Sequence, residues 1–225
     1  MTVGIESNII KHYLKDVYFI NGTAYAGKST MVHMLAERFD MIECGENYHM
    51  AVSRKVAEPA IQPASSYFST MSGWAEFVNR TPDEYEKWIE DGKQEIAQFE
   101  IAELIRLSAR GKKIIVDTNI PLEILREISD YDHVAVMLSP QSMSVERFFD
   151  RSDPDKQFLL GEIDKCPDPA KTMANFRACL ERVNSPEVYR RMKESGFFVH
   201  IRTDCTRDTR EEVLEILSRH FKLNA

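Results

Sequence analysis

Cysteine is scarce in this chain of 225 residues, and its few copies are scattered. No two of them form a C-x-x-C pair, which argues against a zinc site and against a disulfide framework. We therefore expect free thiols in a reducing, cytoplasmic compartment. The four positions are Cys44, Cys166, Cys179 and Cys205.

Long hydrophobic runs are also missing. No stretch approaches the roughly 18 apolar residues of a transmembrane helix, and residues 1–16 lack the basic start and long apolar core of a signal peptide. The net charge is −7, and an acidic chain is a poor non-specific binder of nucleic acid. We expect neither a membrane nor a nucleic acid as a partner.

The motifs of several enzyme classes are absent as well. The six histidines show no H-E-x-x-H or other ligand spacing, and the chain contains neither G-x-S-x-G nor G-x-G-x-x-G. Metal hydrolase, serine hydrolase and dehydrogenase functions therefore have no support in the sequence.

What the sequence does contain is a glycine loop in an informative context. Residues 17–20 are an apolar run typical of a buried strand, residues 22–29 match G-x-x-x-x-G-K-[ST], and residues 30–39 repeat apolar residues at helical spacing. Strand, loop and helix in that order are the context of a P-loop, in which backbone N–H groups and a helix N-terminus hold phosphate. The alternative is a simple glycine turn with a solvated lysine.

Each residue type in this loop has a chemical reason. Gly22 and Gly27 let the backbone turn tightly and approach phosphate oxygens. Lys28 is predicted to hold the β- and γ-phosphates of ATP, with its side chain exposed in the empty loop, and the Ser29 hydroxyl is predicted to bind Mg²⁺. The residues expected to hold the nucleotide are Gly22, Thr23, Ala24, Tyr25, Ala26, Gly27, Lys28, Ser29 and Thr30.

Two acidic residues follow further predicted strands. Residues 114–117 are apolar and end in Asp117, an arrangement typical of Walker B, in which the carboxylate orients Mg²⁺ with the P-loop hydroxyl. Glu46 follows a short strand at 41–44, at the edge of a parallel sheet where ligands bind. Glu46, or failing it Asp117, is the candidate general base; the alternative for Glu46 is a glutamate in the first turn of a helix.

Arginines cluster after the predicted strand at 133–138. Arg147 and Arg151 have i, i+4 spacing and so share a helix face, where forked cations suit a polyphosphate. Residues 151–168 resemble a mobile lid. The alternative for both arginines is a solvated face, and the same two possibilities apply to Arg177 and Arg182.

A largely helical insertion at about 45–95 separates the second and third strands. Thr81 and Glu84 form a predicted capping box around Pro82. The helix that starts there extends to Gly111, with a possible break at 91–92. Its aromatic residues are most often core residues, although one or two can stack on a substrate ring: Trp74, Phe77, Tyr85 and Trp88.

This arrangement resembles the P-loop nucleoside and nucleotide kinase superfamily. The motif-level likeness is limited to residues 22–30, Asp117 and the Arg147/Arg151 pair. It implies a single domain over 1–225 of the α/β class: three layers, α/β/α, and five parallel strands near 17–20, 41–44, 114–117, 133–138 and 197–202, in the order 2-3-1-4-5. It also implies ATP and Mg²⁺.

The resemblance implies site roles too. Arg147 would pack on the adenine, Arg151 would reach the phosphates, and the loop at 203–207 would contact the base. Two features depart from the family pattern. Tyr25 and Ala26 stand where many relatives have glycine and a small residue, and the third strand is followed by Thr118 and Asn119.

The functional hypothesis is a kinase that transfers the γ-phosphate of ATP to a hydroxyl or a phosphate of a small molecule, a nucleoside or nucleotide among the options. Lys28, Asp117, Glu46, Arg147 and Arg151 are its candidate catalytic residues. The alternative is a nucleotide-binding switch that hydrolyses ATP slowly. A helical insertion favours the kinase, because a switch needs no acceptor pocket.

Overall fold

The computed structural model describes residues 7–146, 148–149, 154–203 and 207–223. One sheet of five parallel strands forms its centre, in the order β2-β3-β1-β4-β5. This confirms the predicted fold class and the strand order that the resemblance implied. The strands are β1 (Val17–Gly22), β2 (Ile42–Cys44), β3 (Ile114–Asp117), β4 (Val134–Leu138) and β5 (Phe198–Ile201).

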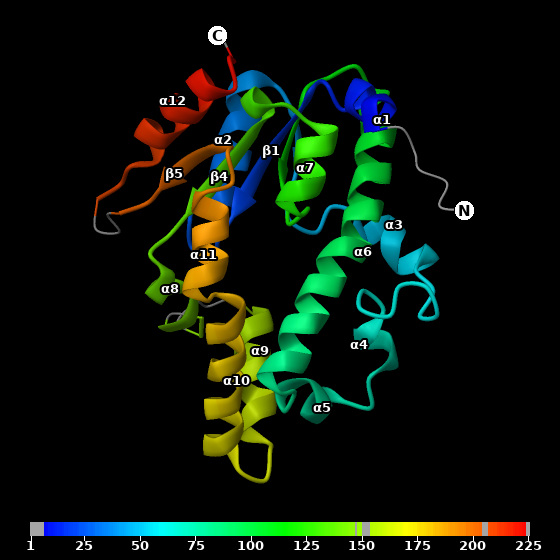
Figure 1. Ribbon diagram of the computed structural model, residues 1–225, viewed down its shortest axis with the longest axis vertical. Helices are drawn as coiled ribbons and strands as arrows, with labels where there is room; N and C mark the ends of the chain where they lie inside the picture. The colour runs from blue at the N-terminus through cyan, green and yellow to red at the C-terminus, as the bar shows by residue number, and fades with distance from the viewer. Residues whose placement is uncertain (1–6, 147, 150–153, 204–206, 224–225) are drawn as a thin grey trace.

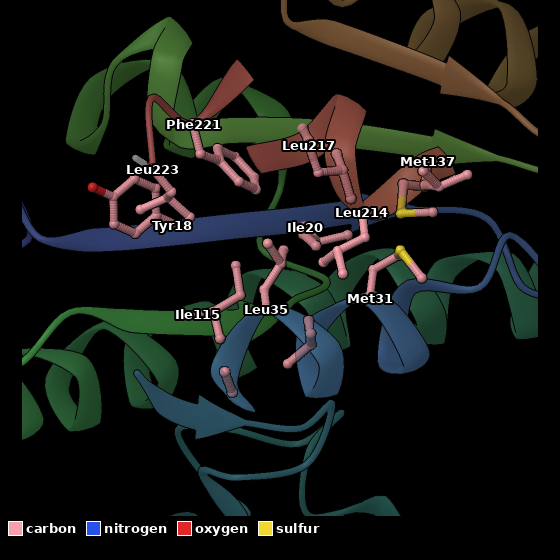
Figure 2. Close-up of a cluster of buried hydrophobic side chains, with 14 of the residues drawn as sticks. Tyr18, Ile20, Met31, Leu35, Ile115, Met137, Leu214, Leu217, Phe221 and Leu223 are labelled. Atoms are coloured by element: carbon pink, nitrogen blue, oxygen red, sulfur yellow. The ribbon is translucent and has the colours of Figure 1, made fainter. Parts of the chain in front are cut away.

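Helices cover both faces of the sheet (Figure 1). On one face α2 (Lys28–Phe39) and α12 (Arg210–His220) pack on strands β1, β3 and β4. Figure 2 shows side chains from the sheet and both helices meeting in this cluster. Because both faces are covered, the three central strands are fully buried and consist largely of aliphatic residues, as parallel strands do.

The second face carries α1 (Ser7–Tyr13), α6 (Pro82–Ser108) and α7 (Leu122–Ile128). The capping box of Thr81 and Glu84 is present at the start of α6. The expected break at 91–92 is wrong, because α6 runs through Gly92 without interruption. Gly92 is buried, and a Cβ there would lie 4.0 Å from Ala64 Cβ, an ordinary contact distance, so the helix continues through this position without a steric need for glycine.

Short helices connect β2 to α6 and lie away from the sheet: α3 (Met50–Val56), α4 (Tyr67–Thr70) and α5 (Trp74–Val78). A short 3-10 helix, η1 (Tyr131–His133), precedes β4. Further helices connect β4 to β5: α8 (Gln141–Glu146), α9 (Pro154–Asp164), α10 (Pro169–Val183) and α11 (Pro186–Lys193). Among the described residues, no helix is long and apolar enough to cross a bilayer.

The helices that lie away from the sheet, together with the start of α6, form a helical region that has a hydrophobic core of its own. Its buried residues come from α4, α5, α6, α9 and α10 (Figure 1). The described part of the predicted lid belongs to this core: Ile163 on α9 is fully buried, and the rings of Phe158 and Trp74 lie 4.9 Å apart. A role for this segment as a lid stays a prediction, as does substrate binding by the insertion at 45–95.

Candidate functional site

The glycine loop, residues 22–29, leaves β1 at the carboxyl edge of the sheet. Gly22 has φ 137°, and a Cβ on it would lie 1.8 Å from the carbonyl oxygen of Met137 on β4. Gly27 has φ 90° and caps α2 in the left-handed conformation. Both glycines are thus needed for conformation, and Gly22 also for the close approach of two strands.

Tyr25 occupies a left-handed conformation as well, with φ 65°. This region is costly for a bulky residue and is held only where the surroundings enforce it. One such contact is a hydrogen bond of 3.2 Å that Arg202 Nη1 donates to the carbonyl oxygen of Tyr25. Tyr25 therefore holds a backbone conformation that glycine adopts more readily.

The loop is fastened to the end of β4 by Ser139, which is fully buried. Its backbone N–H donates to Thr23 Oγ1 at 2.9 Å, and its hydroxyl donates to the carbonyl oxygen of Ala24 at 2.7 Å. Ser139 was not predicted as a site residue. Its contacts with Thr23 and Ala24 join positions more than a hundred residues apart, and no local pattern signals them.

Lys28 and Ser29 both reach Asp117 at the end of β3. Ser29 Oγ donates a hydrogen bond of 2.8 Å to Asp117 Oδ2, and Lys28 Nζ lies 3.7 Å from Asp117 Oδ1. Lys28 Nζ also donates to the carbonyl oxygen of Thr23 at 3.4 Å. The expectation that the Lys28 side chain is exposed is wrong: only 10% of it is, because it folds back over the loop toward Asp117.

The Asp117 carboxylate is buried and incompletely hydrogen-bonded. Its side chain is 1% exposed, and Oδ1 has no hydrogen-bond partner. Burial raises the pKa of Asp117, against the opposing effects of Lys28 and Ser29. An unpartnered carboxylate oxygen beside a serine hydroxyl fits Mg²⁺, which takes hard oxygen ligands.

The protein alone offers few further ligands for a metal ion. Among the described residues no group of three or more His, Cys, Asp or Glu side chains is placed to hold one. Mg²⁺ typically binds one or two protein oxygens together with substrate phosphates. Ser29 and Asp117 therefore fit an ion that arrives with a polyphosphate.

Glu46 points toward this site. Its Oε1 accepts a hydrogen bond of 3.0 Å from Asn119 Nδ2, in the segment after β3, and its charge contributes to the raised pKa of Asp117. Glu46 is exposed and so open to a ligand. Asn119 was not predicted as a site residue, although a polar residue two positions after Asp117 is a local signal for one.

A second buried carboxyl lies behind this edge of the sheet, on α6. Glu100 Oε2 accepts hydrogen bonds from Thr118 Oγ1 at 2.5 Å and from Tyr48 Oη at 3.4 Å. Thr118 and Tyr48 neighbour Asp117 and Glu46 in sequence, so Glu100 ties the two acidic segments together. Burial raises the pKa of Glu100 to about 7. Glu100 was not predicted as a site residue, because one glutamate within a long helix carries no local signal.

A pocket of about 370 Å³ lies on the other side of the loop. Ala26, Gly27 and Thr30 line one wall, and residues at the end of β5 and the start of α12 line the other, among them His200, Arg202 and Arg207. Arg207 belongs to the loop at 203–207 that was predicted to contact the base. Residues 204–206 of that loop lie outside the described residues.

The predicted arginines have different outcomes. Arg147 and Arg151 lie outside the described residues, so their roles stay predictions. Arg182 forms ion pairs with Asp83 and Glu86 at the start of α6, at 2.5 and 2.8 Å. These contacts favour a structural role for Arg182. Arg177 is exposed on α10.

Taken as chemistry, this edge of the sheet brings together backbone N–H groups at the start of α2, a lysine, a hydroxyl and a buried carboxylate, with a second carboxylate close by. Such a set can bind a polyphosphate and a divalent cation, and its second carboxylate can accept a proton. A scan with models of known protein families gives no match to this chain, and a search of curated proteins finds no significant relative.

Proposed function

We propose that this protein is an ATP- and Mg²⁺-dependent phosphotransferase that acts on a small molecule, with the architecture of the P-loop kinase-like superfamily. The observation that carries the proposal is the contact between the loop and β3. Ser29 Oγ lies 2.8 Å from Asp117 Oδ2, and Lys28 Nζ lies 3.7 Å from the other oxygen of the same carboxylate. A glycine turn with a solvated lysine would need neither contact.

Each group has a role in such a reaction. The backbone N–H groups of residues 22–29 and the Lys28 ammonium hold the phosphates, while Ser29 and Asp117 provide oxygens for Mg²⁺. When bound, Mg²⁺ neutralises charge on the phosphates. The protein's contribution is then mainly positioning and stabilisation of charge.

Glu46 is the better placed of the two candidate bases. It is exposed at the carboxyl edge of the sheet, and Asn119 fixes its orientation. Asp117 is less suitable, because its carboxylate is buried and already bound by Ser29.

The buried thiols of Cys44, Cys166 and Cys179 are free, which supports a reducing, cytoplasmic location.

The test is ADP formation by the purified protein with ATP and Mg²⁺, with and without a panel of nucleosides, nucleotides, sugars and antibiotics. Lys28→Met should abolish turnover while keeping most of the buried stem of the side chain. Lys112→Ala is the matched control, because its ammonium binds Asp40 on the surface. Wild-type turnover by Lys28→Met would refute the proposal. ATP hydrolysis that no panel member accelerates would indicate a switch protein instead.

A further inference from the structure

A cavity of about 160 Å³ adjoins the glycine loop and is lined by other residues of the loop than the pocket described above. Gly22, Thr23 and Ala24 form one wall, and Asn119 lies beside them. Asn119 also lines a larger cavity of about 380 Å³ that extends along α7 and α11. Because Asn119 holds Glu46 by a hydrogen bond, the small cavity lies between the loop and the residue that orients the candidate base.

The opposite wall of this cavity is mainly aliphatic. Its aliphatic side chains come from α6, the end of α10 and α11, namely Ile89, Val183, Val188 and Met192, and Asn184 and Tyr189 add polar groups beside them. Among the described residues that line it, the cation is Lys93, whose ammonium is bound to Glu90 at 2.8 Å. Because that ammonium is paired, the described aliphatic lining suits the apolar surface of an uncharged molecule.

One polar group in the cavity lacks a partner. Ser144 on α8 is 2% exposed, lines the cavity, and its hydroxyl makes no hydrogen bond. A buried hydroxyl without a partner is destabilising, and most such groups in proteins are hydrogen-bonded. A polar group on a bound molecule would satisfy it.

We propose that this cavity binds the phosphate acceptor, and that the acceptor is an uncharged alcohol with an apolar body. Its apolar part lies against Ile89, Val188 and Met192, and Ser144 hydrogen-bonds a polar substituent. This assignment rests on the proposed phosphotransferase function, and it specifies that the group that accepts the phosphate is a hydroxyl.

The transfer step balances with Glu46 as the base. The acceptor oxygen forms a bond to the γ-phosphorus of ATP, and the bond from that phosphorus to the β–γ bridging oxygen breaks. ADP leaves with the electron pair of that bond. The hydroxyl proton passes to the Glu46 carboxylate, which accepts a hydrogen bond from Asn119, a residue of the cavity wall.

The experiment compares two sets of acceptors, uncharged aryl and alkyl alcohols and nucleoside monophosphates, by ADP formation with Mg²⁺ and ATP. We expect turnover with alcohols. Val188→Trp, which fills the cavity, should raise the KM for the alcohol more than tenfold and leave ATP affinity unchanged. Arg190→Trp is the matched control on the same helix, because Arg190 is exposed and bound to Glu187.

Ser144→Ala is a milder second variant, which keeps the assignment testable if Val188→Trp does not fold. It should raise the KM for the alcohol about 3- to 10-fold, the worth of one hydrogen bond, with kcat less affected. ATP binding accompanied by turnover of monophosphates, or of neither set, would overturn the alcohol assignment and leave the ATP site intact. Absence of ATP binding would instead refute the proposed function.

Discussion

The hydrophobic cores of the sheet region and of the helical region consist of different kinds of side chain. Both faces of the sheet are packed mainly with aliphatic residues, with a few rings such as Phe19 and Phe221, whereas aromatic rings make up much of the core of the helical region. Backbone hydrogen bonds between the five strands fix the carboxyl edge of the sheet, where the glycine loop and Asp117 lie. The described helical region contains no strand, and its rings pack against Ile89 and Val183, two residues of the wall of the proposed acceptor cavity.

Helix α6 belongs to both regions (Figure 1). Tyr85, near its start, is buried among the aromatic rings, while Leu104 and Leu107, near its end, are buried against the sheet. Glu100 lies on the sheet-facing part and binds Thr118. The helix thereby connects the residues expected to select the acceptor with those expected to transfer phosphate.

The largest expected effect on the free energy of unfolding comes from a substitution in the core of the helical region, which should leave the sheet region unaffected. Phe176 on α10 is 1% exposed and contacts the rings of Phe77 and Tyr85. Phe176→Ala should lower the free energy of unfolding by about 3–5 kcal/mol, the usual cost of such a cavity. Phe158→Ala, at an exposed ring of the same region, is the control and should cost far less.

Urea unfolding gives these stabilities, and binding of Mg²⁺ and ATP to the folded Phe176→Ala protein tests the separation of the regions. We expect the ATP affinity to change less than threefold, because the ring lies in the helical core and lines no part of the loop. An equal loss of ATP affinity and stability would show that the two regions do not act separately.

The next effect concerns the sheet region. Gly22→Ala places a Cβ 1.8 Å from Met137 O at a φ of 137°, so the loop and β4 must move apart. We expect a loss of about 2–3 kcal/mol in the free energy of unfolding and loss of ATP binding. Gly161→Ala on α9 meets no atom within 4 Å and should be neutral or slightly stabilising. Equal urea midpoints for the two variants would contradict this account of the loop.

The third prediction concerns pH and α6. The pKa of Glu100 is raised to about 7 by burial, against about 4.3 for an unperturbed glutamate. The stability that this carboxyl contributes is therefore present below about pH 4 and is lost as the pH rises through 7. Glu100→Gln keeps an acceptor for Thr118 and removes the titration, so it should stabilise the protein at pH 8 by roughly 1–3 kcal/mol.

Urea unfolding at pH 4, 6 and 8 measures this difference, which should shrink toward zero at the lowest pH. Glu103→Gln is the control with the opposite sign, because hydrogen bonds from Arg106 lower the pKa of Glu103 and its stabilising effect is present at high pH. Parallel pH profiles for wild type and Glu100→Gln would contradict the buried, neutral carboxyl.

Local patterns predicted the sheet region well for a physical reason. Parallel strands buried on both faces read as short apolar runs, and the glycine loop and Asp117 each follow directly from one of them. The strand order came only from the family resemblance, because the runs themselves do not show which strands are neighbours. The structure confirmed both the strands and their order.

Long-range contacts were out of reach of the same reasoning. Ser139 binds Thr23 and Ala24 across more than a hundred residues, and the Glu100 carboxyl meets Thr118 only because α6 packs on β3. The Lys28 side chain was expected to be exposed, because the loop motif alone does not show that Asp117, from a distant strand, lies beside it. The part of the site that depends on packing between distant segments therefore emerged only from the structure.

The most direct test of the central claim is the affinity for ATP as a function of Mg²⁺ concentration, measured by calorimetry for wild type and Asp117→Asn. Asparagine keeps the shape of the side chain but removes the charge that would face the ion. We predict that Mg²⁺ strengthens ATP binding to the wild type at least tenfold, and that Asp117→Asn binds ATP with little dependence on Mg²⁺. Failure of the wild type to bind ATP, or an unchanged Mg²⁺ dependence in Asp117→Asn, would contradict a phosphate and magnesium site at this loop.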